Sequence, residues 1–281
     1  MRTRSIGTTK VSEIGLGGMP LSIEGRPDER QAIATIHAAL DAGVTLIDTA
    51  DAYSLEPGET GHNERLIAAA LSSYGPTDVL VATKGGHVRP GDGSWTLDGS
   101  RAHLRSACEA SLTALGVETI GLYQLHRPDP NTDYAESLAA MRELHDDGKV
   151  AMVGISNADV EQIRQAREII GEALVSVQNQ FSPAYRDSEV ELDFCAEQGL
   201  AFLPWSPLGG IGKAGGLGAA FDEIGQAHDA SPQRVCLAWM LAKGPHVLPI
   251  PGSSRSETIR DSARAGELSL TPEEIARLDA A

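Results

Sequence analysis

Four residues in the first half of the chain could together move a proton onto an oxygen atom. Asp48, Tyr53, Lys84 and His126 each lie at or shortly after the end of a short apolar run. A tyrosine hydroxyl has an ordinary pKa of about 10, which is poorly matched to proton donation at neutral pH. The ammonium of Lys84, held by Asp48, would lower that pKa by stabilising the phenolate. His126 would donate a second hydrogen bond to the same oxygen, which suits a reaction that develops an alkoxide.

Delivery of a hydride to a carbonyl group is such a reaction, and the hydride must come from a cofactor because no side chain supplies one. Ser156, Asn157 and Gln178 follow later apolar runs and could hold a carboxamide group. Trp205 offers a flat face for a planar ring. Taken singly, each of these residues has an ordinary structural explanation, such as a cap, a solvated lysine or a buried histidine. Their joint position is what predicts a reductase.

Eight short apolar runs, bounded by turn residues, are predicted as buried strands. They span residues 14–17, 45–48, 79–83, 120–125, 150–155, 174–178, 201–204 and 247–250. Amphipathic stretches of helical length lie between them. These predicted helices span residues 30–42, 62–72, 101–115, 134–147, 159–170, 189–198 and 232–242.

This alternation predicts an α/β fold, either a closed (β/α)₈ barrel or an open doubly wound sheet. The strand count and the chain length of 281 residues favour a TIM barrel that spans residues 1–281 as a single domain. Residues 2–12 predict an N-terminal hairpin that closes one end, and residues 271–281 predict an extra C-terminal helix. In a barrel the strands deliver their C-terminal ends to one rim, which would bring the polar residues named above together.

Two glycine-containing loops, residues 85–99 and 209–218, are long enough to suggest a role in ligand binding. Residues 210–215 fit the pattern GxGxxG, but they do not follow a strand directly, and no acidic residue lies about 20 positions on. A dinucleotide-binding Rossmann fold is therefore not predicted.

The composition excludes several classes of function. With 23 basic and 39 acidic residues, the chain has a formal net charge of −16, which argues against a nucleic-acid partner. No apolar run approaches the ~20 residues of a membrane span, and no signal peptide is recognisable. The three cysteines form no CxxC pair, so neither a disulfide framework nor a metal site is predicted. We expect a cytoplasmic protein that binds a small carbonyl substrate; its oligomeric state cannot be predicted from these features.

Seven segments, in this order and spacing, resemble the aldo-keto reductase family along essentially the whole chain. The matching segments are residues 46–53, 81–84, 122–126, 154–157, 178–183, 205–209 and 250–253. The resemblance implies a barrel that binds NADPH, with Tyr53 as general acid, Lys84 and Asp48 as its tuning pair, and His126 as the residue that orients the carbonyl. It also implies that Trp205 stacks on the nicotinamide.

The resemblance further implies which residues line the cofactor and the substrate. The cofactor contacts would be Gly18, Ser156, Asn157, Gln178, Trp205, Ser206, Pro207, Leu208, Gly209, Gly210, Gly252, Ser253, Arg255, Asp261 and Ser262. The substrate pocket would be formed by Met19, Tyr53, Trp95 and His126.

The chain departs from the well-studied mammalian pattern at three places. Gly252 replaces a lysine that contacts phosphate, and Thr258 replaces an arginine that often binds the 2′-phosphate, so Arg255 is the expected substitute. We also expect this chain to lack the long C-terminal loop that shapes the substrate pocket in many members. Residues 122–127 resemble a subgroup that includes bacterial pyridoxal reductases, but the substrate itself is not readable.

Two other functions stay open at this point. A barrel aldolase could form a Schiff base on Lys84, although a lysine paired with Asp48 stays protonated and is a poor nucleophile. An NADPH-binding redox-sensing subunit, similar to the channel-associated members of the family, would retain the same four residues with little turnover.

Overall fold

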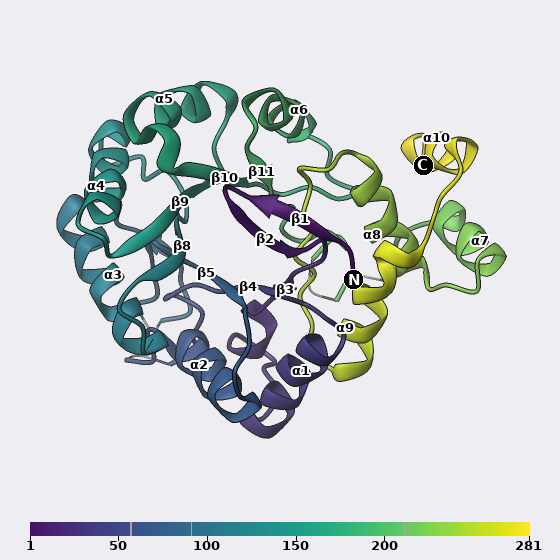
Figure 1. Cartoon of the computed structure of the whole chain (residues 1–281), viewed down its shortest axis with the longest axis horizontal. Helices are drawn as coiled ribbons and strands as arrows, with labels where there is room; N and C mark the ends of the chain where they lie inside the picture. The colour runs from purple at the N-terminus through teal and green to yellow at the C-terminus, as the bar shows by residue number, and fades with distance from the viewer. Residues whose placement is uncertain (57, 91, 211, 214) are drawn as a thin grey trace.

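A computed structural model describes residues 1–56, 58–90, 92–210, 212–213 and 215–281. Within them, a parallel sheet has the strand order β11-β10-β9-β8-β5-β4-β3 and curls into a barrel that helices surround (Figure 1). The strands are β3 (Leu16–Gly17), β4 (Leu46–Asp48), β5 (Leu80–Gly85), β8 (Ile120–Leu125), β9 (Val150–Ser156), β10 (Leu174–Gln178) and β11 (Ala201–Phe202). Each strand is short and almost entirely buried, which is typical of parallel strands covered on both faces.

The predicted eighth strand, residues 247–250, is not a regular strand, but it closes the barrel. The N–H of Leu248 donates to the carbonyl of Phe202 at 2.8 Å on one side. On the other side, the N–H of Gly15 donates to the carbonyl of Pro249 at 2.9 Å. Proline has no N–H, so Pro249 accepts from its neighbour without returning a hydrogen bond. The ladder is therefore incomplete, yet the segment joins β11 to β3 and completes the predicted (β/α)₈ barrel.

Ten helices are present in the described part of the chain. They are α1 (Glu29–Asp41), α2 (His62–Tyr74), α3 (Arg101–Leu115), α4 (Tyr134–Asp146), α5 (Val160–Ile170), α6 (Glu189–Gln198), α7 (Ala219–Ala227), α8 (Pro232–Ala242), α9 (Ser256–Ala263) and α10 (Pro272–Asp279). Every helix predicted from the sequence is observed, including the extra C-terminal one, α10.

Side-chain caps explain why several helices begin where the sequence predicts. The side chain of Asp159 accepts a hydrogen bond from the N–H of Gln162, and the side-chain oxygen of Gln162 accepts one from the N–H of Asp159. Ser231 caps α8 in a similar way by accepting from the N–H of Arg234 at 3.0 Å. Such caps satisfy N–H groups that have no partner within the helix.

Two α-helices and one β-hairpin were not predicted. The first turns of α7 and α9 lack a side-chain cap, because Gly218 and Arg255 stand at their N-cap positions. Their start signal is therefore absent from the sequence. The loop of residues 85–99 contains a two-stranded hairpin of β6 (His87–Val88) and β7 (Thr96–Leu97), strands of two residues each.

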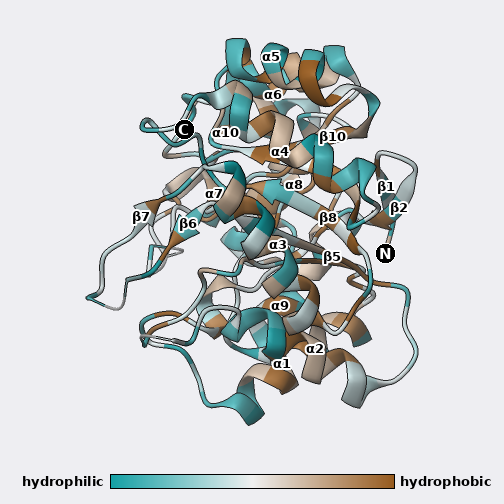
Figure 2. Ribbon diagram, turned by 90° about the vertical axis from the view of Figure 1, so that its left-hand side faces the viewer, coloured by the Kyte–Doolittle hydropathy of each residue, from teal (hydrophilic) through white to brown (hydrophobic). Residues whose placement is uncertain are grey.

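The predicted N-terminal hairpin is formed by β1 (Thr3–Ile6) and β2 (Thr9–Ser12). It lies across one end of the barrel, and the β6–β7 hairpin lies at the opposite end (Figures 1 and 2). Ile6 and Val11 are buried against aliphatic residues from the barrel interior. This cluster comprises Leu46, Leu80, Ala82, Leu122, Val175, Ala201, Leu203, Leu248 and Ile250. The hairpin is thus an apolar plug, which leaves the other end for polar groups.

No helix among the described residues is long and apolar enough to cross a membrane.

Replacement of Ile6 by alanine is expected to lower the free energy of unfolding by about 2–5 kcal/mol, because Ile6 is fully buried in the plug. Turnover of the folded variant should be unchanged, because the plug closes the end of the barrel opposite to the polar residues at the C-terminal ends of the strands. Urea denaturation and steady-state kinetics would measure the two effects. Val190→Ala is a control. Val190 is 65% exposed, so this substitution should change the free energy of unfolding little. Unchanged stability of Ile6→Ala would contradict the plug.

Candidate active site

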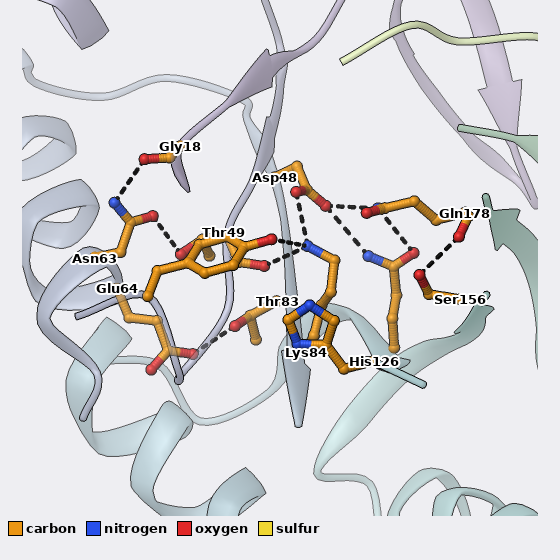
Figure 3. A network of polar contacts seen from close by, with 12 residues as sticks. Gly18, Asp48, Thr49, Asn63, Glu64, Thr83, Lys84, His126, Ser156 and Gln178 are labelled. Atoms are coloured by element: carbon orange, nitrogen blue, oxygen red, sulfur yellow. Dashed lines mark hydrogen bonds and ion pairs between the residues drawn. The ribbon is translucent and has the colours of Figure 1, made fainter. Parts of the chain in front are cut away.

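Strand register brings the four predicted catalytic residues to one end of the barrel. Asp48 ends β4 and pairs with Ala82 of β5, so Lys84 lies one pleat nearer the rim. His126 follows the last residue of β8, and Tyr53 lies in the loop after β4. All four side chains are buried or nearly so. Figure 3 shows Lys84 reaching toward Asp48, with His126 beside it.

The ammonium of Lys84 is the centre of this arrangement. Its Nζ donates to Oδ2 of Asp48 at 2.7 Å, to the carbonyl of Thr49 at 2.8 Å and to Oη of Tyr53 at 3.2 Å. An ammonium has three donors, so these partners use all of them. The Lys84 residue is 0% exposed. A charge buried this deeply is tolerated only when it is paired and hydrogen-bonded.

Burial lowers the pKa of Lys84, but the charge of Asp48 and the contact with Tyr53 raise it more, so the pKa lies above its ordinary value. The amine therefore stays protonated at neutral pH. A Schiff base requires the neutral amine, so the position of Lys84 opposes its use as a nucleophile.

The pKa of Tyr53 lies above its ordinary value, opposite to the direction expected from the sequence. Burial raises this pKa, and the nearby ammonium of Lys84 only partly offsets the rise. The expectation considered the charge of Lys84 but not the loss of solvent around the phenol. At neutral pH the hydroxyl therefore keeps its proton and can act as a donor.

His126 is neutral at neutral pH. Burial lowers its pKa well below the ordinary value, and the positive charges of Lys84 and Arg127 add to this effect. The buried Nδ1 atom has no hydrogen-bond partner in the described part of the chain. The ring lies edge-on to that of Tyr53, with centroids 5.8 Å apart. A ligand oxygen between the two rings could accept from both.

A layer of amides across the barrel holds the second oxygen of Asp48. Nε2 of Gln178 donates to Oδ1 of Asp48 at 2.7 Å, and Nε2 of Gln124 approaches the same oxygen at 3.4 Å. Gln124 was missed by the sequence reasoning, although it alternates in phase with Leu122 and His126 along β8. Gly154 makes the room, because a Cβ there would lie 2.8 Å from Cγ of Gln124.

The mouth above these residues is a cavity of about 860 Å³. The predicted site residues that line it are Met19, Asp48, Tyr53, Trp95, His126, Ser156, Asn157, Gln178, Trp205, Ser206, Pro207, Leu208, Gly210, Gly252, Ser253, Arg255, Asp261 and Ser262. Lys84, Gly18 and Gly209 do not line it. Lys84 lies beneath the floor, and Gly209 accommodates a turn with a φ of +88°.

Gly18 has a structural position rather than one on the cavity wall. Its N–H donates to the carbonyl of Asp48 at 2.7 Å, and its carbonyl accepts from Nδ2 of Asn63 at 2.9 Å (Figure 3). A Cβ at this residue would lie 2.5 Å from Oδ1 of Asn63. The glycine lets the loop after β3 approach β4 and α2 closely, which helps to fix Asp48.

Several cavity residues were not predicted. They are Gly17, Pro20, His87, Arg127, Gly212, Gly215, Gln233, Ile250, Ser254, Glu257 and Thr258. Gly17, Pro20, Arg127 and Ser254 directly adjoin residues that were predicted, and His87, Gly212, Gly215 and Ile250 lie within segments already singled out in the sequence. Gln233 and Glu257 belong to no recognised motif, so tertiary contact alone identifies them. Residues 211 and 214, which belong to the glycine-rich loop 209–218, lie outside the described residues, as does residue 91 of the loop 85–99.

Aromatic rings form one wall of the cavity near the hydroxyl of Tyr53. The ring of Trp95 is 6.4 Å from that of Tyr53, and the ring of His87 is 4.2 Å from that of His126. The guanidinium of Arg89 lies over Trp95 at 4.3 Å and binds Glu24 at 2.7 Å. The β6–β7 hairpin is thus tied to the loop after β3, and this tie positions Trp95.

The opposite part of the cavity offers groups that suit phosphate. Arg255 is exposed and forms no ion pair within the described residues. It occupies the N-cap position of α9, where no side chain caps the first turn. Free N–H groups at a helix start attract anions. Asp261, by contrast, binds Arg234 and Ser231, so its carboxylate connects α9 to α8.

No group of three or more His, Cys, Asp or Glu residues that could hold a metal ion occurs among residues 1–56, 58–90, 92–210, 212–213 and 215–281.

Asp48→Asn is expected to lower the free energy of unfolding by about 3–5 kcal/mol, because Lys84 would remain buried without its counter-charge. Adding Lys84→Met should restore part of that loss. Chemical denaturation of the single and double variants measures both effects. Glu161→Gln removes a carboxylate that is 86% exposed and should change little. If the double variant is no more stable than Asp48→Asn, an unpaired charge is not the cause.

Comparison with known proteins agrees with this geometry. The model of the aldo/keto reductase family matches residues 13–281. Pyridoxine 4-dehydrogenase from Escherichia coli is 33% identical over 288 residues, which cover 99% of this chain and 97% of that protein. A glycerol dehydrogenase structure from Gluconobacter oxydans is 29% identical with a TM-score of 0.85, covering 99% of this chain and 94% of that one.

A second solved structure is an aldo/keto reductase from Klebsiella pneumoniae in complex with NADP and acetate. It is 26% identical with a TM-score of 0.82, and the match covers 99% of this chain and 94% of that one. The fold, the sequence match and the arrangement of residues at the barrel mouth all point to the same protein family. The chain belongs to the aldo/keto reductase family of oxidoreductases.

Proposed function

We propose that this protein reduces an aldehyde or ketone to an alcohol with NADPH, and that Tyr53 is the general acid. The observation that carries the proposal is the contact of 3.2 Å between Oη of Tyr53 and Nζ of Lys84, at the floor of a cavity that His126 also lines. The carbonyl carbon would gain a hydride and the oxygen a proton, while NADPH is oxidised to NADP⁺.

The residues present fit a nicotinamide cofactor. Trp205 lines the cavity with a buried Nε1 that has no partner among the described residues, and its flat face suits a planar ring. Asn157 adopts a φ of +58° and donates from Nδ2 to the carbonyl of His126 at 3.0 Å, which fixes its amide next to Ser156. Ser156, Asn157 and Gln178 together would hold the carboxamide. When bound, NADPH supplies the hydride.

The phosphate groups would lie along the loop after β11 and the start of α9. Ser206, Pro207, Leu208 and Gly210 line the cavity on that loop, and Gly209 would contribute its backbone. Gly252, Ser253, Arg255, Asp261 and Ser262 would surround the adenosine end. The hydroxyl of Ser253 already donates to the carbonyl of Arg255 at 2.8 Å, so it would help to shape this loop. The solved Klebsiella pneumoniae relative, which contains NADP, supports this choice of cofactor.

The chain's own residues would perform the proton transfer. Tyr53 is protonated at neutral pH and donates to the carbonyl oxygen. As the proton leaves, Lys84 stabilises the phenolate at hydrogen-bond distance, and Asp48 keeps that ammonium in place. Neutral His126 donates a second hydrogen bond to the same oxygen. Two preorganised donors stabilise the charge that develops on oxygen without reorganising at the moment of reaction.

An aldolase that uses Lys84 is disfavoured by the ion pair with Asp48 and by the raised pKa of Lys84. Borohydride treatment in the presence of a carbonyl substrate would trap a Schiff base if one formed. The substrate is best sought with a panel of aldehydes and ketones that includes pyridoxal, because a relative from Escherichia coli is a pyridoxine 4-dehydrogenase. NADPH consumption is the readout.

Tyr53→Phe is expected to lower kcat about 10²–10⁴-fold, because it removes a positioned acid and leaves the ring. NADPH binding should persist, since the hydroxyl lies at the carbonyl end of the site. Steady-state reduction and cofactor titration measure the two quantities. Tyr185→Phe is a matched control, because Tyr185 is exposed and does not line the cavity. Near-full turnover of Tyr53→Phe would rule out this residue as the acid.

Arg255→Ala is expected to weaken NADPH binding about tenfold or more and to leave NADH binding within about twofold. A guanidinium binds a phosphate through two charge-assisted hydrogen bonds, and the 2′-phosphate is what distinguishes the two cofactors. Glu257, two residues further on, lines the same end and would oppose a phosphate, so the preference depends on Arg255.

Dissociation constants from fluorescence titration give the result. Arg260→Ala removes an equivalent charge from the same helix without touching the cavity and serves as the control. An equal loss of affinity for both cofactors in Arg255→Ala would contradict this assignment.

A further inference from the structure

Arg127 places a positive charge at the end of the cavity where Tyr53 and His126 lie. It follows His126 directly in sequence, lines the cavity and is exposed to solvent. It lines the cavity together with His87 and His126, and its charge contributes to lowering the pKa of both histidines. Neither the mechanism nor the cofactor contacts proposed above use this residue.

No carboxylate of the described residues forms an ion pair with Arg127, although the chain has a net charge of −16. The nearest acidic residue in sequence, Asp129, is occupied elsewhere. Its carboxylate accepts from the N–H of Gly99 at 2.9 Å and from Asn131 and Thr132. At the floor of the cavity, Asp48 is neutralised by Lys84. Among the residues that the structure describes, Arg127 is therefore a cation without a counter-charge.

Strand order separates Arg127 from the cofactor's phosphate end. Around the barrel the order is β3, β4, β5, β8, β9, β10, β11 and then the closing segment, residues 247–250. Arg127 follows β8, and Arg255 follows the closing segment, four positions away in a ring of eight. The two arginines consequently lie on opposite sides of the mouth. A cofactor that places its phosphate at Arg255 leaves Arg127 free.

We propose that Arg127 selects aldehydes that carry an anionic oxygen group, a carboxylate or a phosphate, a short distance from the carbonyl. This inference rests on the proposed reductase function and names its substrate class. His126 and Arg127 line the same cavity, so a substituent of a carbonyl held by His126 shares that space with the Arg127 side chain. The neutral rings of His87 and Trp95 form the wall beside it and cannot replace the charge.

Matched substrate pairs test the proposal. 4-Carboxybenzaldehyde is compared with its methyl ester, and glyceraldehyde 3-phosphate with glyceraldehyde, so that the two pairs separate a carboxylate from a phosphate. For at least one pair, kcat/KM of the wild-type protein should favour the anion about tenfold or more. The preference should shrink in high salt, because Arg127 is exposed and its charge is screened.

Arg127→Met should reduce the ratio of kcat/KM for the anionic over the neutral substrate to about one, mainly by raising KM for the anion. The kcat/KM for the neutral substrate should stay within about twofold of the wild-type value. Arg127→Lys should retain part of the preference. Arg30→Met is the control, since Arg30 is an exposed arginine on α1 that does not line the cavity. The proposal is overturned if the wild type shows no preference in either pair, or if the preference survives Arg127→Met.

Calorimetric binding of benzoate and inorganic phosphate, with and without NADPH, separates this proposal from the proposed function. If the neutral aldehydes are reduced but anions bind equally to wild type and Arg127→Met, the reductase stands and the anion site is wrong. If no aldehyde is reduced but an anion binds in a manner that requires Arg127, the site stands and the reductase function fails. If neither turnover nor Arg127-dependent binding is found, both are wrong.

Discussion

A single buried charge, the ammonium of Lys84, is the constraint around which the barrel mouth is organised. Removing an ion from water costs several kcal/mol even after the protein relaxes, so its partners must be in place when the chain folds. Asp48, Thr49 and Tyr53 supply one acceptor each. The register between β4 and β5 places the carboxylate and the ammonium within reach. The same contacts that make the charge tolerable also orient the hydroxyl that we propose as the acid.

The need for hydrogen-bond partners extends from Lys84 to the other buried polar side chains at this end of the barrel. Asp48 carries a second oxygen that must also be satisfied, and Gln178 from β10 donates to it across the barrel. Gln124 reaches the same oxygen only because Gly154 leaves space. Below these side chains the interior is aliphatic, closed by Ile6 and its neighbours. One barrel therefore has a polar end and an apolar end.

Loops at the mouth are held by ion pairs between different βα units. Arg26 binds Glu59 in a bidentate manner at 2.9 and 3.0 Å, and this partner lowers the pKa of Glu59 to about 2. Arg89 links the β6–β7 hairpin to Glu24. These pairs join the loops after β3, β4 and β5, which carry Met19, Tyr53 and Trp95. The wall of the cavity near the acid is thus built by loops that stabilise one another.

Much of the architecture could be predicted from sequence, because short buried strands, capped helices and the order of motifs are local signals. Periodicity identified the strand that ends at Asp48 and the strand that His126 follows, and cap residues such as Asp159 identified helix starts. The eighth strand was located correctly, but its irregular hydrogen bonding was not predicted. That irregularity depends on which neighbouring strand each proline faces, since a proline has no N–H to donate. The uncapped helices α7 and α9 carried no start signal and were missed.

The sequence by itself determined which residue types reach the rim, since strand order and the two-residue alternation of side chains fix that outcome. Tertiary structure alone decided the rest. The direction of the pKa of Tyr53 depends on how completely the phenol is buried, because desolvation competes with the charge of Lys84. The placement of His87 beside His126 depends on distances between segments far apart in the chain. So does the lack of an ion pair between Arg127 and any carboxylate of the described residues. A one-dimensional pattern contains no such distances, so burial and charge balance appear only once the barrel is closed.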